Sequence, residues 1–211
     1  KSINRQVAVL TDDQKSIPGS IIVDSDSLLH EMIDSCMSQS CIALDTEFIR
    51  TDTFFPKPAL IQIFDGQQVY LVDPLKVEDL EPLKHLFLAP SVVKVMHSCS
   101  EDMEVFSCLV DFYPSPLVDT QVAANLVGYD FSISYQRLVE ITLGEQLEKS
   151  ETRSNWLKRP LTSQQLLYAA DDVLWLLDAY HVLVEKLKSL NRLSWLYEDC
   201  EALVSRHTEV Q

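Results

Sequence analysis

Two carboxylates close an apolar segment early in the chain, where Asp45-Thr46-Glu47 follows Cys41-Ile42-Ala43-Leu44. Side chains alternate between the two faces of an extended strand, so Asp45 and Glu47 point one way while Thr46 and Phe48 point the other. Two like charges on one buried face are costly unless a divalent cation neutralises them or one carboxyl group stays protonated. The pattern therefore favours a metal site at the end of this strand.

A second acidic element follows the apolar segment 92–96, in the run His97 to Phe106. Ser100 is a suitable N-cap, which places Asp102 in the first turn of the next helix. Sites in α/β sheets gather at this position, just beyond the carboxyl end of a strand. Acids in a first turn also complement the helix dipole, and taken alone this segment favours that structural role.

A third element lies late in the chain, in the predicted helix that carries Tyr168 and Asp172. Thr162 and Gln165 have the spacing of a capping box at its start. Tyr168 and Asp172 are four residues apart and therefore share one face of the helix, whereas Asp171 points elsewhere. Taken alone, this pair could be no more than a hydrogen bond on a helix surface.

The remaining pattern predicts the elements that position these residues. A short strand over 21–23 and a helix over 25–36 come first, and Asp65-Gly66 is a strong hairpin signal between two strands. The other predicted elements are strands over 41–48, 59–64, 68–72 and 92–96 and helices over 77–88 and 100–109, with a largely helical chain after Asp119. This order predicts an α/β fold, a mixed sheet flanked by helices with a largely helical C-terminal half.

Composition narrows the protein class. The 211 residues are 46 % hydrophobic, which suits one large domain, and no apolar segment has the length of a membrane span. No secretory signal is evident, and the five cysteines lack metal-site spacing, so we expect a cytoplasmic protein with reduced thiols and no membrane partner. The net charge of −15 argues against a broad basic groove for nucleic acid, although cations held by carboxylates can still bind a phosphate.

The three acidic elements together resemble the DEDD superfamily of 3′–5′ exonucleases, in the subgroup that carries Tyr before the last Asp. Further segments resemble the ribonuclease D family, over about residues 20–190. These segments are Ala43 to Phe48, Leu60-Ile61-Gln62, Ser100 to Phe106, Asp119-Thr120-Gln121, Lys149 to Leu161 and Tyr168 to Val173. The resemblance implies a ribonuclease H-like fold and a single nuclease domain over 1–211, without the HRDC modules that usually follow it.

The resemblance also implies a catalytic site with two divalent cations, Mg²⁺ or Mn²⁺. Asp45 would bridge both ions, Glu47 and Asp172 would complete the position that activates water, and Asp102 would hold the second ion. Tyr168 would orient the water. The implied reaction releases nucleoside 5′-monophosphates from the 3′ end of RNA.

The expected partner is single-stranded or 3′-tailed RNA, including transfer RNA precursors. The expected substrate contacts are Thr46, Phe48, Arg153 and Lys158, with Phe48 against the terminal base and a basic cluster formed by Lys149, Arg153, Lys158 and Arg159 near the RNA backbone. Solvated surface charge is the alternative for this cluster. Two other functions stay open, a non-catalytic RNA-binding or scaffolding domain and a 3′–5′ exodeoxyribonuclease.

Three further residues are expected to be structural. We expect Asp119 to cap the following helix, His97 to be held within the fold, and Trp156 to lie in the core.

Overall fold

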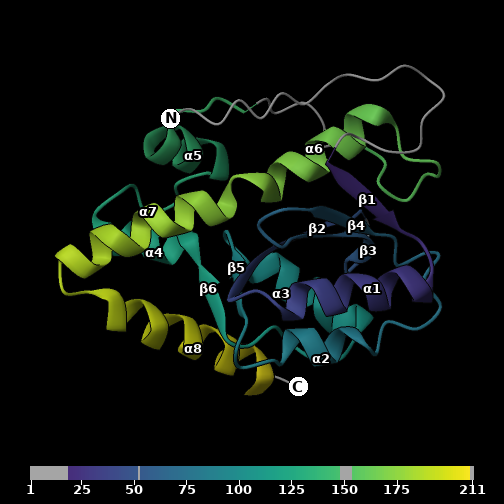
Figure 1. The fold of residues 1–211 in the computed structure, drawn as a ribbon, viewed down its shortest axis with the longest axis horizontal. Coiled ribbons are helices and arrows are strands. Elements are labelled where there is room, and N and C mark those ends of the chain that lie inside the picture. The colour runs from purple at the N-terminus through teal and green to yellow at the C-terminus, as the bar shows by residue number, and fades with distance from the viewer. Residues whose placement is uncertain (1–18, 52, 148–153, 210–211) are drawn as a thin grey trace.

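A six-stranded mixed sheet forms the centre of the protein (Figure 1), as seen in a computed structural model that describes residues 19–51, 53–147 and 154–209. The strand order is β1-β4-β3-β2-β5-β6. The strands are β1 (Ser20–Val23), β2 (Cys41–Ile49), β3 (Lys57–Phe64), β4 (Val69–Val72), β5 (Val93–Met96) and β6 (Leu117–Asp119). Strands β2, β3 and β4 pair antiparallel, whereas β1, β5 and β6 add in parallel. The predicted mixed sheet is confirmed.

The hairpin between β3 and β4 forms where Asp65-Gly66 predicts it. Gly66 has φ +93°, a left-handed conformation that glycine adopts without strain. One Asp65 carboxylate oxygen accepts hydrogen bonds from the backbone N–H groups of Gln67 and Gln68, at 2.8 and 2.7 Å. The turn is therefore fixed by local chemistry.

Helices cover both faces of this sheet. They are α1 (Asp26–Met37), α2 (Leu83–Phe87), α3 (Ser100–Leu109), α4 (Thr120–Val127), α5 (Tyr135–Leu143), α6 (Ser163–Leu174), α7 (Leu176–Ser189) and α8 (Leu193–Glu209). Buried side chains of α1, α2 and α3 form a core on one face, and those of α4 to α7 form a second core on the other. Figure 1 shows α1 and α2 on the opposite side of the strands from α6 and α7. Among the described residues, no helix has the length and apolarity needed to cross a membrane.

The two cores fix the orientation of β2. Ile42 and Leu44 belong to the core under α1 to α3, whereas Ala43 belongs to the core under α6 and α7. Since side chains alternate along a strand, Asp45 and Glu47 lie on the α6 side and Thr46 on the α3 side. The alternation predicted from the sequence is confirmed.

Predicted helix starts are mostly confirmed. The Ser25 hydroxyl accepts from the N–H of Leu28 at 3.4 Å. Thr162 and Gln165 form the predicted capping box at the start of α6. Asp119 accepts from the N–H of Gln121 at 2.8 Å, so its predicted capping role is also confirmed.

Two helix boundaries differ from the sequence prediction. The helix predicted over 77–88 is only Leu83–Phe87, because Pro82 restricts the residue before it and lacks an N–H group. Cys99, and not Ser100, is the N-cap of α3, without a side-chain capping bond, although Asp102 still lies in the first turn.

Candidate active site

Three carboxylates from two elements converge at one place. The ligand oxygens of Asp45 and Glu47 in β2 and of Asp172 in α6 all lie within 4.8 Å of one another. Ala169, Ala170 and Val173 pack α6 onto the β2 face that carries both acids, which brings Asp172 to them. A set of donors made only of carboxylates suits hard divalent cations such as Mg²⁺ or Mn²⁺. The residues present therefore fit a divalent metal site.

Asp102 approaches this trio from the opposite side of β2. It is 7 % exposed, and the Thr46 hydroxyl donates a hydrogen bond to its Oδ1 at 2.5 Å. Thr46 thus has a partner within the protein, in addition to the substrate contact that the sequence predicts for it. The alternation along β2 explains this pairing, since it turns Thr46 towards α3 while Asp45 faces α6.

Without a cation, burial and mutual repulsion disfavour the ionised form of these acids. Burial raises the pKa of Asp45 well above its usual value, and the charges of Asp102, Asp172 and Glu47 raise it further. Burial followed by the charge of Asp172 raises the pKa of Glu47 to about 9, and burial raises the pKa values of Asp102 to about 7 and of Asp172 to about 8. The cluster therefore retains protons near neutral pH, and a bound cation would displace them.

Tyr168 lies one helical turn before Asp172, as its spacing predicts. A hydrogen bond joins the two side chains, and it lowers the pKa of Asp172 against the effect of burial. Burial and the charge of Asp172 raise the pKa of Tyr168, so its hydroxyl keeps its proton at neutral pH. The tyrosine ring lies 6.0 Å, between centroids, from Trp156, which is 1 % exposed and belongs to the core as expected.

Of the residues expected to contact substrate, Phe48 lies at an irregular point of β2 and Lys158 lies on the surface. The β2–β3 register shifts between Glu47 and Phe48, directly before the residue predicted to contact the terminal base. Lys158 is exposed, as a phosphate contact requires. Arg153 and Lys149 lie outside the described residues.

Arg159 is not available to the RNA backbone, so this part of the predicted basic cluster is wrong. Its Nε and Nη2 donate to the two carboxylate oxygens of Asp73 at 2.7 and 2.8 Å, and Nη2 also donates to the carbonyl of Ala59 at 2.7 Å. Asp73 is buried at the end of β4, far from Arg159 in sequence. Nothing in the local charge pattern around Arg159 signals such a distant partner.

His97 is held within the fold, as expected. Its ring nitrogens lie 2.8 Å from the Thr120 hydroxyl and 2.9 Å from the carbonyl oxygen of Ile133. The ring therefore ties the segment before α3 to α4 and to the segment before α5.

Tyr135 and Gln62 lie beside the acids, and the sequence alone predicts no role for either. The Tyr135 hydroxyl donates to the carbonyl of Asp171 at 2.9 Å, and burial, followed by the charge of Asp172, raises the pKa of Tyr135. Gln62 lies directly opposite Asp45 in the β2–β3 register. A lone polar residue in the apolar strand segment Ala59 to Phe64 was a signal for Gln62, whereas no local pattern indicates Tyr135.

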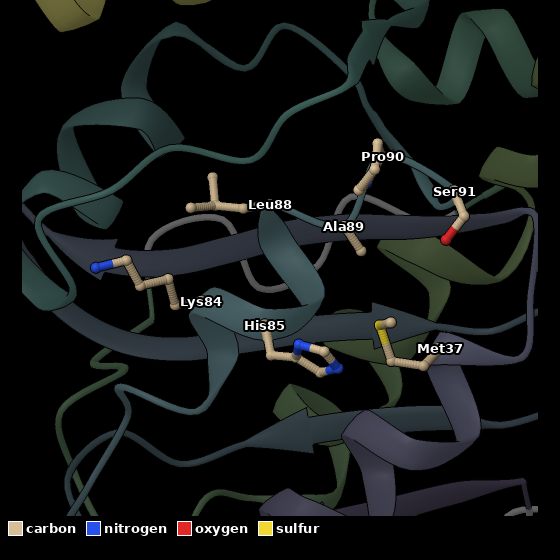
Figure 2. A pocket seen from close by; sticks show the side chains of 7 residues that line it. All are labelled: Met37, Lys84, His85, Leu88, Ala89, Pro90 and Ser91. Atoms are coloured by element: carbon tan, nitrogen blue, oxygen red, sulfur yellow. The ribbon is translucent and has the colours of Figure 1, made fainter.

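A separate surface hollow of about 480 Å³ lies at the end of α1 and α2 (Figure 2). It is lined by Met37, Lys84, His85, Leu88, Ala89, Pro90 and Ser91. The helices beside it pack on the sheet face opposite α6, and its lining contains no acid. This hollow is therefore distinct from the carboxylate site.

Comparisons with known proteins agree with this geometry. A family model described as 3′–5′ exonuclease matches residues 20–188. Ribonuclease D of Shewanella sp. (strain ANA-3) is 43 % identical over 181 residues, covering 86 % of this chain and 47 % of that protein. Ribonuclease D of Escherichia coli K12 is 39 % identical over 189 residues, covering 90 % of this chain and 50 % of that protein.

Solved structures share the fold. The crystal structure of Escherichia coli RNase D, described as an exoribonuclease involved in structured RNA processing, matches with a TM-score of 0.87 and 38 % identity, over 90 % of this chain and 50 % of that one. The catalytic core of RRP6 from Trypanosoma brucei matches with a TM-score of 0.79 and 25 % identity, over 88 % of this chain and 51 % of that one. The chain thus spans about half the length of the curated relatives it matches.

Proposed function

The chain belongs to the 3′–5′ exonuclease family, and on that premise we propose that it is a ribonuclease D-like exoribonuclease that shortens RNA from its 3′ end. The observation that carries this proposal is the convergence of Asp45, Glu47 and Asp172, with oxygens within 4.8 Å of one another. A metal-dependent nuclease needs such a cluster, whereas a binding module gains nothing from mutually repelling acids at one place.

Each acid has a proposed role in holding two divalent cations. Asp45 is the proposed ligand common to both ions, with Glu47 and Asp172, whose oxygens lie within 4.8 Å of it, completing one position. Asp102 stands outside the tight trio, and we assign it to the second position. Bound cations would supply activation of the attacking water and charge stabilisation at the departing oxygen.

Tyr168 is proposed to orient the attacking water. Its hydroxyl stays protonated beside Asp172 and can donate a hydrogen bond near the scissile phosphate. In the proposed reaction the water oxygen forms a bond to phosphorus and the bond from phosphorus to the 3′ oxygen breaks. A nucleoside 5′-monophosphate leaves, and the shortened RNA gains the proton at its new 3′ hydroxyl.

The proposed substrate is RNA with a single-stranded 3′ end, including transfer RNA precursors, and the proposed setting is the cytoplasm. Phe48 is proposed to contact the terminal base. Lys158, which is exposed, is proposed to contact a phosphate. Thr46 and Arg153 are further proposed substrate contacts. We further propose that the chain acts as one nuclease domain with its core at about 20–190.

A single assay tests this function. A 5′-labelled single-stranded RNA is incubated with the protein and Mg²⁺ or Mn²⁺, beside the Asp45→Asn variant, an EDTA control and a DNA strand of matched sequence. We expect a ladder that shortens from the 3′ end, absent in the variant and with EDTA. RNA that is bound but stays intact with both metals would overturn the proposal in favour of a binding module, and a preference for the DNA strand would favour an exodeoxyribonuclease.

A further inference from the structure

A fully buried amide without a hydrogen-bond partner lies at the carboxylate site. Gln62 in β3 is 0 % exposed, and neither its Nε2 nor its Oε1 has a hydrogen-bond partner. Its neighbours on the same face of β3, Leu60 and Phe64, are apolar core residues. Buried polar groups are almost always satisfied, and an unsatisfied one costs stability. An apolar residue would serve the fold better at this position.

The strand register brings this amide next to Asp45. The two residues are directly opposite each other in the antiparallel β2–β3 pair. Directly opposite residues share one face of the sheet, with Cβ atoms about 4.5–5.5 Å apart. Helix α6, which carries Asp172, covers the same face. The Gln62 amide is therefore within reach of the Asp45 carboxylate.

We propose that Gln62 is a positioning residue: when Asp45 is ionised on a bound cation, the Gln62 amide N–H group donates a hydrogen bond to this carboxylate and fixes its orientation. This inference rests on the proposed function. A donor beside a ligating carboxylate fixes its orientation and favours its ionised form, and such supporting residues strongly influence metal affinity.

The Gln62→Met variant tests this role, because methionine has a similar volume without polar atoms. We expect its Mn²⁺ affinity, measured by calorimetry, to fall by about 10- to 100-fold. In EDTA its melting temperature should rise by about 2–4 °C, since a buried unsatisfied amide is removed. A change of stability and metal affinity in opposite directions is not expected for a purely structural residue.

Gln165 provides a matched control. It is also buried, but its amide donates to the Ser154 hydroxyl at 2.6 Å, and its oxygen accepts from the N–H of Thr162 at 2.9 Å. The Gln165→Met variant should lower the melting temperature and leave Mn²⁺ affinity within about twofold of wild type.

A double-mutant cycle separates this inference from the proposed function. In the Asp45→Asn background, Gln62→Met should have no further effect on Mn²⁺ affinity. Wild-type Mn²⁺ affinity in Gln62→Met would overturn the inference, even if the wild-type protein degrades RNA. Conversely, a wild-type protein that binds Mn²⁺ without degrading RNA would overturn the proposed function while the positioning role of Gln62 remains supported by the binding data.

An independent observation concerns the loop between β2 and β3. Phe54 and Phe55 are 86 % and 65 % exposed, and their rings pack edge to face with centroids 5.0 Å apart. Exposed aromatic surface is unfavourable in water, and a polar loop has no structural need for two adjacent phenylalanines. The pair therefore points to a ligand with flat apolar faces.

The loop is held beside the candidate active site. It begins directly after β2, the strand of Asp45 and Glu47, and Arg50 forms an ion pair of 2.5 Å with Glu104 of α3, the helix of Asp102. The Thr53 hydroxyl donates to the carbonyl of Phe55 at 2.9 Å, which stabilises the turn that presents both rings.

We infer that Phe54 and Phe55 form a stacking platform for bases of the RNA strand upstream of its 3′ end, and this inference also rests on the proposed function. With a net charge of −15, the chain is poorly suited to gain affinity from phosphate neutralisation. Stacking on aromatic rings supplies affinity that is independent of charge and tolerant of sequence.

Substrate length tests this platform. The Phe54→Ala/Phe55→Ala double variant should raise KM for a ten-nucleotide RNA by about tenfold. Its kcat/KM for a dinucleotide, which has only one base upstream of its 3′-terminal nucleotide, should change much less. Phe131→Ala removes another aromatic ring, 82 % exposed and outside this loop, and should change neither value.

The outcomes are distinguishable from those that concern the reaction itself. Equal kinetics of the double variant and the wild type on the longer RNA would overturn the platform and leave the exonuclease intact. An equal loss on both lengths would also overturn it, because the loop would then act on the catalytic step. A wild type that degrades neither RNA would overturn the proposed function and the platform together.

Discussion

The acid at the end of β4 and the acids of the candidate active site have opposite surroundings. Asp73 at the end of β4 is fully paired, since Arg159 donates to both of its carboxylate oxygens. Asp45, Glu47 and Asp172 instead face one another, and each has its pKa raised by burial. Acids of the first kind complete their interactions within the chain and stabilise it. Acids of the second kind depend on a cation, and the fold bears their repulsion.

The ion pair of Asp73 and Arg159, called the paired region below, also supports the acids of the candidate active site, called the unpaired region. Arg159 donates to the carbonyl oxygens of Trp156 and Ala59, at 2.6 and 2.7 Å, and so joins the segment before α6 to β3. Trp156 packs beside Tyr168. The stable ion pair therefore helps to place the tyrosine of the candidate active site, and the two regions can be separated by substitution.

The sharpest test of the unpaired region is Asp45→Asn. We expect RNA degradation to slow by about 10³-fold, the scale of losing a major electrostatic contribution to catalysis. In EDTA the variant should melt about 2–4 °C above the wild type, because one of the repelling acids is removed. A melting temperature lowered by the substitution would show that these acids stabilise the fold and would remove the contrast between the regions.

Arg159→Ala should lower the stability of the protein while most of its activity remains. Removing one partner of a buried ion pair leaves Asp73 uncompensated and should cost about 3–5 kcal/mol of unfolding free energy, measured by urea denaturation. Activity per folded molecule should change much less than in Asp45→Asn. As a control, Arg137→Ala removes an exposed ion pair with Glu140 and should cost only about 0–1 kcal/mol.

The pH dependence of stability should separate the regions further. The pKa values of Glu47, Asp172 and Asp102 are raised to about 9, 8 and 7, so the folded state binds more protons than the unfolded state. Stability in EDTA should therefore fall as the pH rises from about 5 towards 9. Thermal melting across this range measures the slope, which should become shallower in Glu47→Gln. An unchanged slope in that variant would contradict the assignment to these acids.

The smallest expected effect belongs to Lys158→Ala. One exposed phosphate contact should change the logarithmic salt dependence of RNA binding by about one unit, with a uniform loss of affinity across sequences. Fluorescence anisotropy with Ca²⁺ in place of Mg²⁺ measures this slope. Lys188→Ala, on α7 and paired with Glu185, is the matched control and should leave the slope unchanged.

The local sequence was sufficient for much of the fold, whereas the complete set of acids was expected only from the family resemblance. Alternation along Cys41 to Phe48 correctly placed Asp45 and Glu47 on one face, and spacing correctly placed Tyr168 one turn from Asp172. Helix boundaries were less predictable. The helix expected over 77–88 was too long, because the helix begins only after Pro82, which has no N–H group and restricts the residue before it.

The sequence alone determined the interactions of a residue only where its partners are close to it in the chain. Strand alternation, helix spacing and caps are local, which is why the shared face of Asp45 and Glu47, the Asp65-Gly66 turn and the capping box were predictable. Tertiary structure alone decided that Arg159 turns inward to Asp73, that Thr46 supports Asp102, and that Gln62 lies unpaired opposite Asp45. Those outcomes depend on contacts between segments far apart in sequence, which no local periodicity encodes.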